Sequence, residues 1–96
     1  MDSATQTLSD SQLRHTLGEL PEWALEDGKL VRYWTFPGFV QAMEFVNGVA
    51  QLAEQEGHHP DIYLTWGKVK VTLWTHAVGG LSENDFILAA KADALR

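Results

Sequence analysis

Two pairs of strand-like segments, each joined by a tight turn, constrain the fold of this chain more than any other feature. The first pair surrounds Asp27-Gly28 and the second surrounds Gly67-Lys68. Val, Ile, Leu, Thr and aromatic residues dominate the flanking segments, and in the second pair apolar residues alternate with polar ones, as they do in half-buried strands. Asp-Gly is a strong signal for a tight turn between antiparallel strands. We therefore expect two β-hairpins.

Three segments with helical signals flank and separate the hairpins. The first follows the capping-box sequence SDSQ at residues 9–12 and ends near Gly18. The second runs from Phe39 to about Glu56, and a third begins after the cap sequence SEND at residues 82–85. In the second segment, the apolar stripe that we expect to face the sheet consists of Phe39, Met43, Val46, Ala50 and Ala53.

The predicted order is helix, strand, strand, helix, strand, strand, helix (α-β-β-α-β-β-α). Because the connection within each strand pair is short, an α+β fold in two layers is the natural solution, with a four-stranded antiparallel sheet and three helices on one face. A chain of 96 residues, 45% of them hydrophobic, can build one compact core and hardly two. We expect a flexible N-terminal tail at residues 1–7 and a single domain at residues 8–96.

The second helix has a wide apolar sector. Phe45, Val49 and Leu52 lie beside the predicted stripe. Two interpretations stay open, a contact between subunits and a well-buried central helix. Cysteine is absent, and a small domain without disulfides needs good packing or a partner subunit to be comfortably stable. The sequence is therefore compatible with a homo-oligomer.

Composition excludes several functional classes. Seven Lys and Arg against thirteen Asp and Glu give a net charge of −6, which repels phosphate backbones, so no direct nucleic-acid binding is expected. The sequence has no apolar run long enough to cross a bilayer. Its start, MDSATQTLSD, has neither the basic residues nor the apolar stretch of a signal peptide. We expect a cytoplasmic protein without a membrane partner.

Adjacent histidines lie at the predicted end of the second helix, in the sequence EQEGHHPD at residues 54–61. Gly57 fits the left-handed position that follows a helix, and Pro60 prevents a restart nearby. A residue before proline is extended, so the side chains of His58 and His59 should point apart. Taken alone, the two histidines favour a polar surface loop.

A third histidine favours an active site instead. His76 ends the predicted fourth strand, and antiparallel pairing in the second hairpin returns it toward the loop that carries His58 and His59. Imidazole, with an ordinary pKa of about 6.5, transfers protons in both directions near neutral pH. Glu54 lies four residues before His58, about 40° around a continued helix, where a carboxylate fixes the imidazole tautomer. The alternative for Glu54 is an ordinary solvated side chain.

The histidines lack the spacing of metal ligands, and the chain is rich in tryptophan. No HExxH or HxH pair places two ligands on one face, so we expect no metal site. Four tryptophans are many for a chain of this length, and most of them should fill the core. Trp23 and Trp66 are the two that we consider for stacking against a flat heterocycle. The sequence has no phosphate-binding loop and no recognisable Ser-His-Asp set.

A spaced set of residues resembles the signature of the pterin-4a-carbinolamine dehydratase family, also described as dimerisation cofactor of a homeodomain transcription factor. The set consists of Glu54, His58-His59-Pro60, Trp66, His76 and Asp85, with five, nine and eight residues in the gaps after Pro60. The sequences KVKVTLWTH and GLSENDFILA also look like the family. The resemblance covers nearly the whole chain.

The resemblance implies a fold of four antiparallel strands with three helices on one side, assembled into homodimers or homotetramers. It implies an enzyme that removes water from 4a-hydroxytetrahydrobiopterin or a related pterin to give the quinonoid dihydropterin, after aromatic amino acid hydroxylation. The pterin is the substrate, and no metal or organic cofactor takes part. The alternative is a non-catalytic dimerisation or assembly cofactor on the same scaffold. The apolar second helix and the acidic composition favour this alternative.

The resemblance also implies roles for individual residues. His58 and His76 would form the leading acid/base pair, and His59 would chiefly bind and orient the pterin. Support or substrate binding would fall to Glu54, Trp23, Trp66 and Asp85. A shared site for His58 and His59 conflicts with the expectation from local geometry that their side chains point apart.

Overall fold

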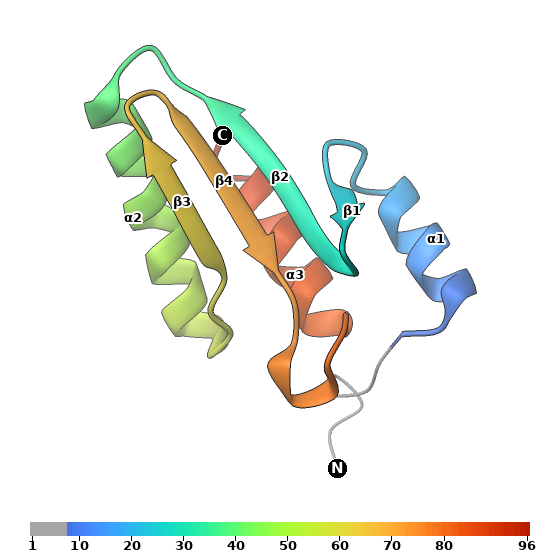
Figure 1. Ribbon diagram of the computed structural model, residues 1–96. Coiled ribbons are helices and arrows are strands. Elements are labelled where there is room, and N and C mark those ends of the chain that lie inside the picture. The colour runs from blue at the N-terminus through green and yellow to red at the C-terminus, as the bar shows by residue number, and fades with distance from the viewer. Residues whose placement is uncertain (1–7) are drawn as a thin grey trace.

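The computed structural model of the chain describes residues 8–96 (Figure 1). Its elements are α1 (Asp10–Gly18), β1 (Ala24–Glu26), β2 (Lys29–Thr35), α2 (Phe39–Glu56), β3 (Asp61–Thr65), β4 (Lys68–Leu73), the 3-10 helix η2 (His76–Val78) and α3 (Glu83–Asp93). This order confirms the predicted alternation of helices and strand pairs. The predicted tail, residues 1–7, lies outside the described residues.

Local sequence signals account for the first helix and the first hairpin. The hydroxyl of Ser9 accepts a hydrogen bond from the backbone N–H of Gln12 at 3.3 Å, and the Gln12 side chain accepts one from the Ser9 N–H at 2.9 Å. This reciprocal pair is the capping box that starts α1. In the turn between β1 and β2, Asp27 and Gly28 both have positive φ, 53° and 74°. A two-residue hairpin turn of type I′ requires such angles, and Asp-Gly adopts them readily.

The four strands form one antiparallel sheet with the order β1-β2-β4-β3. The two hairpins join along β2 and β4, where Leu30 lies opposite Leu73 and Trp34 lies opposite Val69. In the second hairpin the start of β3 lies beside the end of β4, with Asp61 opposite Thr72. The loop that precedes β3 is therefore at the same end of the sheet as the chain that follows β4.

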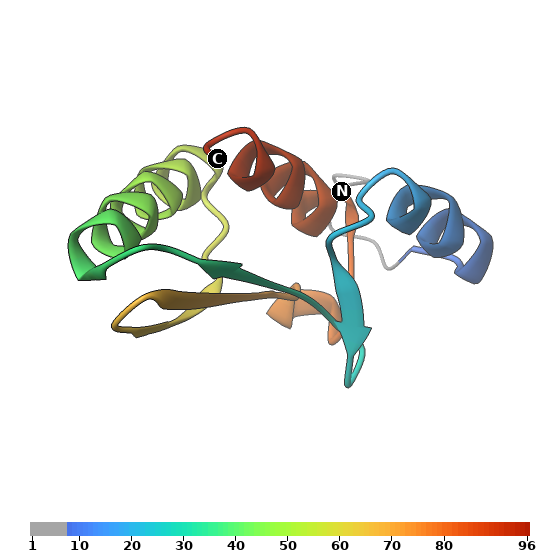
Figure 2. The same ribbon diagram turned by 90° about the horizontal axis from the view of Figure 1, so that it is seen from above.

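All three helices lie on one side of the sheet, with α1 at the end nearest β1 (Figure 2). This arrangement confirms the predicted two-layer α+β fold. Apolar side chains from the helices and from one sheet face form the core, which includes Leu30, Trp34, Val69, Val71, Leu73, Phe45, Val49, Phe86 and Leu88. Each large side chain buried in this way stabilises the fold by about 1.5–3 kcal/mol relative to leaving it exposed. Among the described helices, none is long and apolar enough to span a bilayer.

The face of α2 that is buried differs from the predicted stripe. The buried residues of α2 are Ala42, Phe45, Val49 and Ala53. Only Ala53 belongs to the predicted stripe, and Phe39 is 49% exposed. Because α2 carries apolar residues on adjoining faces, its rotation depends on tertiary fit. The centroid of the Phe45 ring lies 4.6 Å from that of the Trp34 ring. This contact turns the face of α2 that carries Phe45 and Val49 toward the sheet, in place of the predicted stripe.

The chain after β4 also departs from the prediction. β4 ends at Leu73, so His76 lies in η2 and not at a strand end. Thr75 continues the pairing for one residue through an isolated bridge, in which its N–H donates to the carbonyl of Gly80 at 2.8 Å. Gly79 has a φ of 64° and reverses the chain between the two bridge residues. The tight loop that results lifts residues 76–78 out of the strand.

Candidate active site

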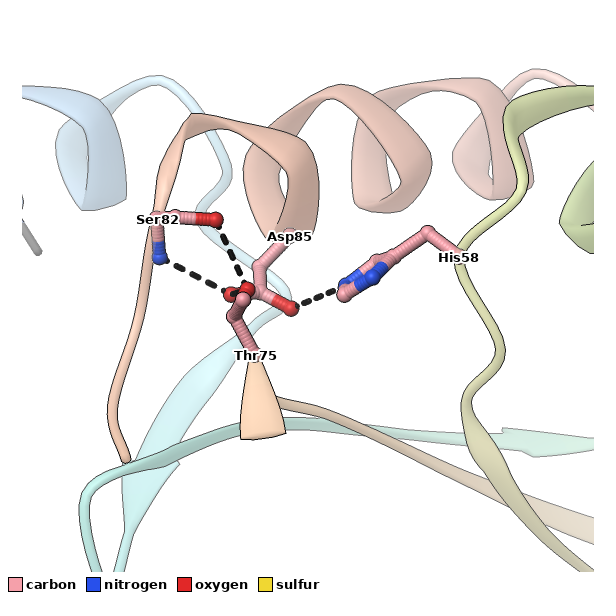
Figure 3. Close-up of polar contacts among 4 residues, drawn as sticks. All are labelled: His58, Thr75, Ser82 and Asp85. Atoms are coloured by element: carbon pink, nitrogen blue, oxygen red, sulfur yellow. Dashed lines mark hydrogen bonds and ion pairs between the residues drawn. The ribbon is translucent and has the colours of Figure 1, made fainter. Parts of the chain in front are cut away.

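The loop at residues 57–60 leaves α2 through a reversal centred on Gly57. Gly57 has a φ of 63°, and its N–H donates to the carbonyl of Glu54 at 3.4 Å. The N–H of His58 donates to the carbonyl of Ala53 at 3.1 Å. These two bonds form a Schellman motif, which satisfies the last carbonyls of the helix. The motif turns the chain away from the helix axis and directs His58 toward α3 (Figure 3).

A buried carboxylate meets His58 at this end of the sheet. Nε2 of His58 lies 2.6 Å from Oδ1 of Asp85, and the two side chains are 13% and 0% exposed. The other carboxylate oxygen, Oδ2, accepts from the Thr75 hydroxyl at 2.7 Å and from the Ser82 N–H at 2.9 Å (Figure 3). The hydroxyls of Thr75 and Ser82 are 2.7 Å apart. A buried carboxylate is costly unless it is hydrogen-bonded, and Asp85 is bonded on both oxygens.

His59 pairs with a different carboxylate. Its Nε2 lies 2.5 Å from Oε2 of Glu54, in a contact where the side chains are 63% and 77% exposed. Helical spacing continued past residue 56 predicts Glu54 beside His58, with an ordinary solvated side chain as the alternative. That placement is wrong because Gly57 reverses the chain, so His59 is the residue that returns to the last turn of α2.

The two adjacent imidazoles therefore point apart, as the extended backbone before Pro60 predicted. His58 contacts Asp85 on the buried side, and His59 contacts Glu54 in solvent. The family resemblance implied one site lined by both rings. In the structure they share a loop and have separate carboxylate partners.

His76 is positioned by an aromatic contact. Its ring stacks on Trp74 with centroids 3.9 Å apart and an interplanar angle of 29°. Between these two residues, Thr75 directs its hydroxyl to Asp85. Within residues 8–96, no hydrogen bond or ion pair joins His76 directly to His58. Asp85 instead connects the two segments, because His58 and the neighbour of His76 bind its two oxygens.

The structure does not bring Trp23 or Trp66 to the histidines. Trp23 is 5% exposed, and its indole N–H donates to Oδ1 of Asp93 at 2.8 Å, so it is part of the core. Trp66 is 67% exposed and lies in the turn between β3 and β4. The loop of His58 is at the other end of β3, and a five-residue strand spans about 16 Å. Their roles in binding a substrate stay predictions.

Two surface hollows lie away from the histidines. One, of about 310 Å³, is between α2 and the C-terminal residues Leu95 and Arg96. The other, of about 390 Å³, is between α1 and α3. Neither is lined by a histidine. Residues 8–96 contain no group of three or more His, Cys, Asp or Glu side chains arranged to hold a metal ion.

Thr75 and Ser82 are members of the site that the sequence-based prediction missed. Thr75 continues the every-second-residue series of Val69, Val71 and Leu73, which is a signal for an inward-facing hydroxyl. Ser82 was recognised only as a helix cap, three residues before Asp85. The bond from the Ser82 N–H to Asp85 is part of that cap, and the same carboxylate then holds His58. One side chain thus serves the helix start and the candidate site.

The arrangement around His58 is suited to proton transfer. Nε2 is bonded to Asp85, while Nδ1 has no hydrogen-bond partner among the described residues. Nδ1 is therefore the ring nitrogen that can meet a bound molecule. A histidine held on one nitrogen by a carboxylate and open on the other is a common general acid or base.

Known proteins are similar to this chain over most of its length. Residues 6–95 match the family model described as pterin 4 alpha carbinolamine dehydratase. A relative from Marinobacter nauticus, named provisionally as a pterin-4-alpha-carbinolamine dehydratase, is 52% identical over 92% of this chain and 83% of its own length. A relative from Chlorobaculum tepidum with the same provisional name is 49% identical over the same shares.

Solved structures are similar as well. A transcriptional coactivator/pterin dehydratase from Brucella melitensis superposes with a TM-score of 0.90 at 32% identity, over 94% of this chain and 98% of that one. A pterin dehydratase-like protein, described as a RuBisCO assembly factor in the alpha-carboxysome, has a TM-score of 0.62 at 30% identity, over 76% and 84%. The match over almost the whole sequence shows that the chain belongs to the pterin 4 alpha carbinolamine dehydratase family.

Proposed function

We propose that this protein dehydrates 4a-hydroxytetrahydropterins, and 4a-hydroxytetrahydrobiopterin in particular, to the quinonoid dihydropterin. Such a reaction recycles the pterin cofactor of aromatic amino acid hydroxylases. Family membership and the provisional names of the relatives support a pterin dehydratase. The single observation that carries the proposal is the His58–Asp85 pair, which holds one ring nitrogen and leaves the other open.

The chemistry of this reaction requires only an acid and a base. The C4a–O bond breaks, the adjacent ring nitrogen loses its proton, and a C=N double bond forms between these two ring atoms. The departing hydroxide takes up a proton and leaves as water. No electrons are gained or lost overall, so the step needs no redox partner, and we propose that neither a metal nor an organic cofactor takes part. Histidines near neutral pH suit both proton transfers.

In this proposal the two transfers belong to His58 and His76. The stack on Trp74 supports His76 in a fixed orientation next to the segment that shares Asp85 with His58. His59, paired with Glu54 in solvent, has the freedom to adjust to a bound pterin, which suits a binding and orienting role.

Stopped-flow absorbance on chemically generated 4a-hydroxytetrahydropterin tests the proposal. We expect the wild-type protein to accelerate dehydration above the spontaneous rate and His58→Ala/His76→Ala to lose that acceleration. His15→Ala is the matched control, because His15 lies in α1 and outside the site. The proposal would be wrong if the dehydration rate with wild-type protein equals the spontaneous rate, or if the double variant accelerates dehydration as much as the wild type.

A second candidate function is a non-catalytic dimerisation or assembly cofactor. The observation that favours it is the similarity to the structure described as a RuBisCO assembly factor. A pull-down with a saturable protein partner that is unaffected by His58→Ala/His76→Ala would support this function. Loss of capture in the double variant would indicate that the partner binds at the histidines themselves.

We further propose that the protein acts in the cytoplasm as a homodimer or homotetramer. Three large apolar side chains on its surface, Phe39, Val40 and Trp66, are 49%, 66% and 67% exposed and suit a subunit contact. The net charge of −6 argues against direct contact with nucleic acid.

A further inference from the structure

We propose that Thr75 and Ser82 are positioning residues that act through Asp85 to hold His58 in a single tautomer. In that tautomer Nε2 carries the proton and Nδ1 is the atom that exchanges protons with a bound substrate. The assignment of Nδ1 to the reaction rests on the proposed function. The tautomer itself follows from the hydrogen bonds of the protein alone.

The direction of each hydrogen bond is fixed by counting protons. The Thr75 hydroxyl has one proton, and it points to Oδ2 of Asp85 at 2.7 Å. The contact of 2.7 Å between the Thr75 and Ser82 hydroxyls can then be made only if Ser82 is the donor. The chain of donors therefore runs from Ser82 to Thr75 to Asp85.

The same count fixes the proton on His58. Oδ2 of Asp85 accepts from the Thr75 hydroxyl and from the Ser82 N–H, which leaves Oδ1 for His58. A carboxylate accepts hydrogen bonds and donates none, so the proton in the His58–Asp85 contact lies on Nε2. In the neutral ring the lone pair is then on Nδ1.

Burial makes this arrangement hard to replace with water. Thr75 is 7% exposed, and Ser82 and Asp85 are 0% exposed. A buried acceptor that loses a donor stays unsatisfied, because water cannot reach it. The pair of His59 and Glu54 differs in this respect, since both side chains are mostly exposed and water can exchange with either partner. The His58 ring is therefore constrained by a buried carboxylate, whereas the partner of His59 is in solvent.

In catalysis the two nitrogens of the His58 ring then have different roles. When His58 is neutral, Nδ1 accepts a proton from the substrate, and when it is protonated, the Nδ1–H donates one. Nε2 keeps its proton in both states, because Asp85 is held in place by Thr75 and Ser82. Loss of the Thr75 or Ser82 hydroxyl should allow the Asp85 carboxylate to rotate and the Nδ1–H tautomer of His58 to form.

NMR of the histidine ring nitrogens tests the proposal without a substrate. The variants are Thr75→Val, which removes the hydroxyl at nearly constant shape, Thr75→Ser, which keeps it, and the control Thr72→Val, the same change three residues earlier on β4. At a pH where the His58 ring is neutral, we expect the Nε2–H tautomer in the wild type, in Thr75→Ser and in Thr72→Val. In Thr75→Val we expect a mixture of tautomers.

Kinetics provide the second readout. We expect Thr75→Val to lower kcat on the order of tenfold with little change in KM, and Thr75→Ser to restore most of it. Should Thr75→Val not fold, Ser82→Ala replaces it, with a shift toward the mixed tautomer in the same direction and a smaller loss of kcat. An Nδ1–H tautomer in the wild type, or wild-type ring signals in both Thr75→Val and Ser82→Ala, overturns the proposal. If the wild type has the Nε2–H tautomer and shows no dehydration, the proposed function fails and the positioning role stands.

Discussion

Asp85 is the residue on which the helix start, the sheet end and the candidate site all depend. Its carboxylate is 0% exposed and bonds to Thr75, Ser82 and His58. Burying a carboxylate costs several kcal/mol before its partners compensate, and an apolar residue in its place is often at least as stable. We therefore interpret Asp85 as a residue whose placement serves the chemistry of His58 more than the stability of the fold.

Asp85→Asn should separate these two roles. The amide has one accepting oxygen and one donating NH2 group. If the NH2 group faces His58, Nε2–H loses its acceptor. If the oxygen faces His58, it no longer accepts from Thr75 and Ser82. We expect kcat/KM to fall by on the order of a hundredfold, as expected when a histidine is left in the wrong tautomer. Urea denaturation should show a loss of about 1–3 kcal/mol in the free energy of unfolding, the cost of one unsatisfied buried group.

The matched control is Asp93→Asn. Asp93 also accepts two hydrogen bonds, from Trp23 and from Arg32, but it pins α3 to the sheet away from the histidines. This variant should lose stability and keep its kcat/KM. Equal losses of activity in the two variants would mean that Asp85 acts only through the fold.

At the scale of elements, the end of α2 decides where His58 goes. The Schellman motif at Gly57 needs a left-handed residue, and the glycine has a φ of 63°. A Cβ added there meets no atom within 4 Å, so the cost of Gly57→Ala is conformational and not steric crowding. His58 follows directly, and any rearrangement of the motif moves its ring relative to Asp85.

Gly57→Ala should therefore lower both stability and activity. We expect the free energy of unfolding to fall by about 1 kcal/mol, since alanine is strained at positive φ. Thermal denaturation and stopped-flow dehydration provide the two measurements. Gly18→Ala is the control, because Gly18 ends α1, has no positive φ and has open space around the added Cβ. A Gly57→Ala variant that is as stable and active as Gly18→Ala would show that the helix end does not position the loop.

Two chain segments with exposed apolar side chains lie at the end of the sheet opposite the histidines. Phe39 and Val40 start α2, and Trp66 is in the turn between β3 and β4. The two segments are held together by the N–H of Phe36, which donates to the carbonyl of Gly67 at 2.7 Å. We infer that this end takes part in a subunit contact.

Analytical ultracentrifugation of Val40→Glu tests that contact. The wild type should sediment as a dimer or tetramer. The dissociation constant of the variant's assembly should be raised roughly tenfold or more, because a charge would be buried at the interface. Ile87→Glu, a change at a 41% exposed residue on α3, should leave the assembly intact. A wild-type monomer at all concentrations would contradict the homo-oligomer.

The fold was predictable from sequence because its signals are local. Asp27-Gly28, the cap at residues 9–12 and the alternation in the second hairpin each act within a few residues, and together they leave one two-layer arrangement. The rotation of α2 was not predictable, because its apolar residues surround more than one face and the contact of Phe45 with Trp34 decides between them.

The candidate site was predictable as a set of positions and not as a set of contacts. The resemblance singled out Asp85 and the three histidines, but the bond from Asp85 to His58 joins residues 27 apart and forms only in the folded chain. Helical spacing suggested the wrong partner for Glu54, since it ignored the reversal at Gly57. Thr75 and Ser82 carry no catalytic signal of their own and become visible only through the carboxylate that they share.

A crystal structure with 7,8-dihydrobiopterin, a reduced pterin that has no 4a-hydroxyl group to lose as water, tests the proposed site most directly. We predict that the pterin lies at the end of the sheet where β4 ends and α3 begins, with Nδ1 of His58 and the ring of His76 facing the bond between C4a and its neighbouring nitrogen. Nε2 of His58 should stay bonded to Asp85. A pterin bound at the opposite end near Trp66, or in the hollow between α1 and α3, would contradict the account.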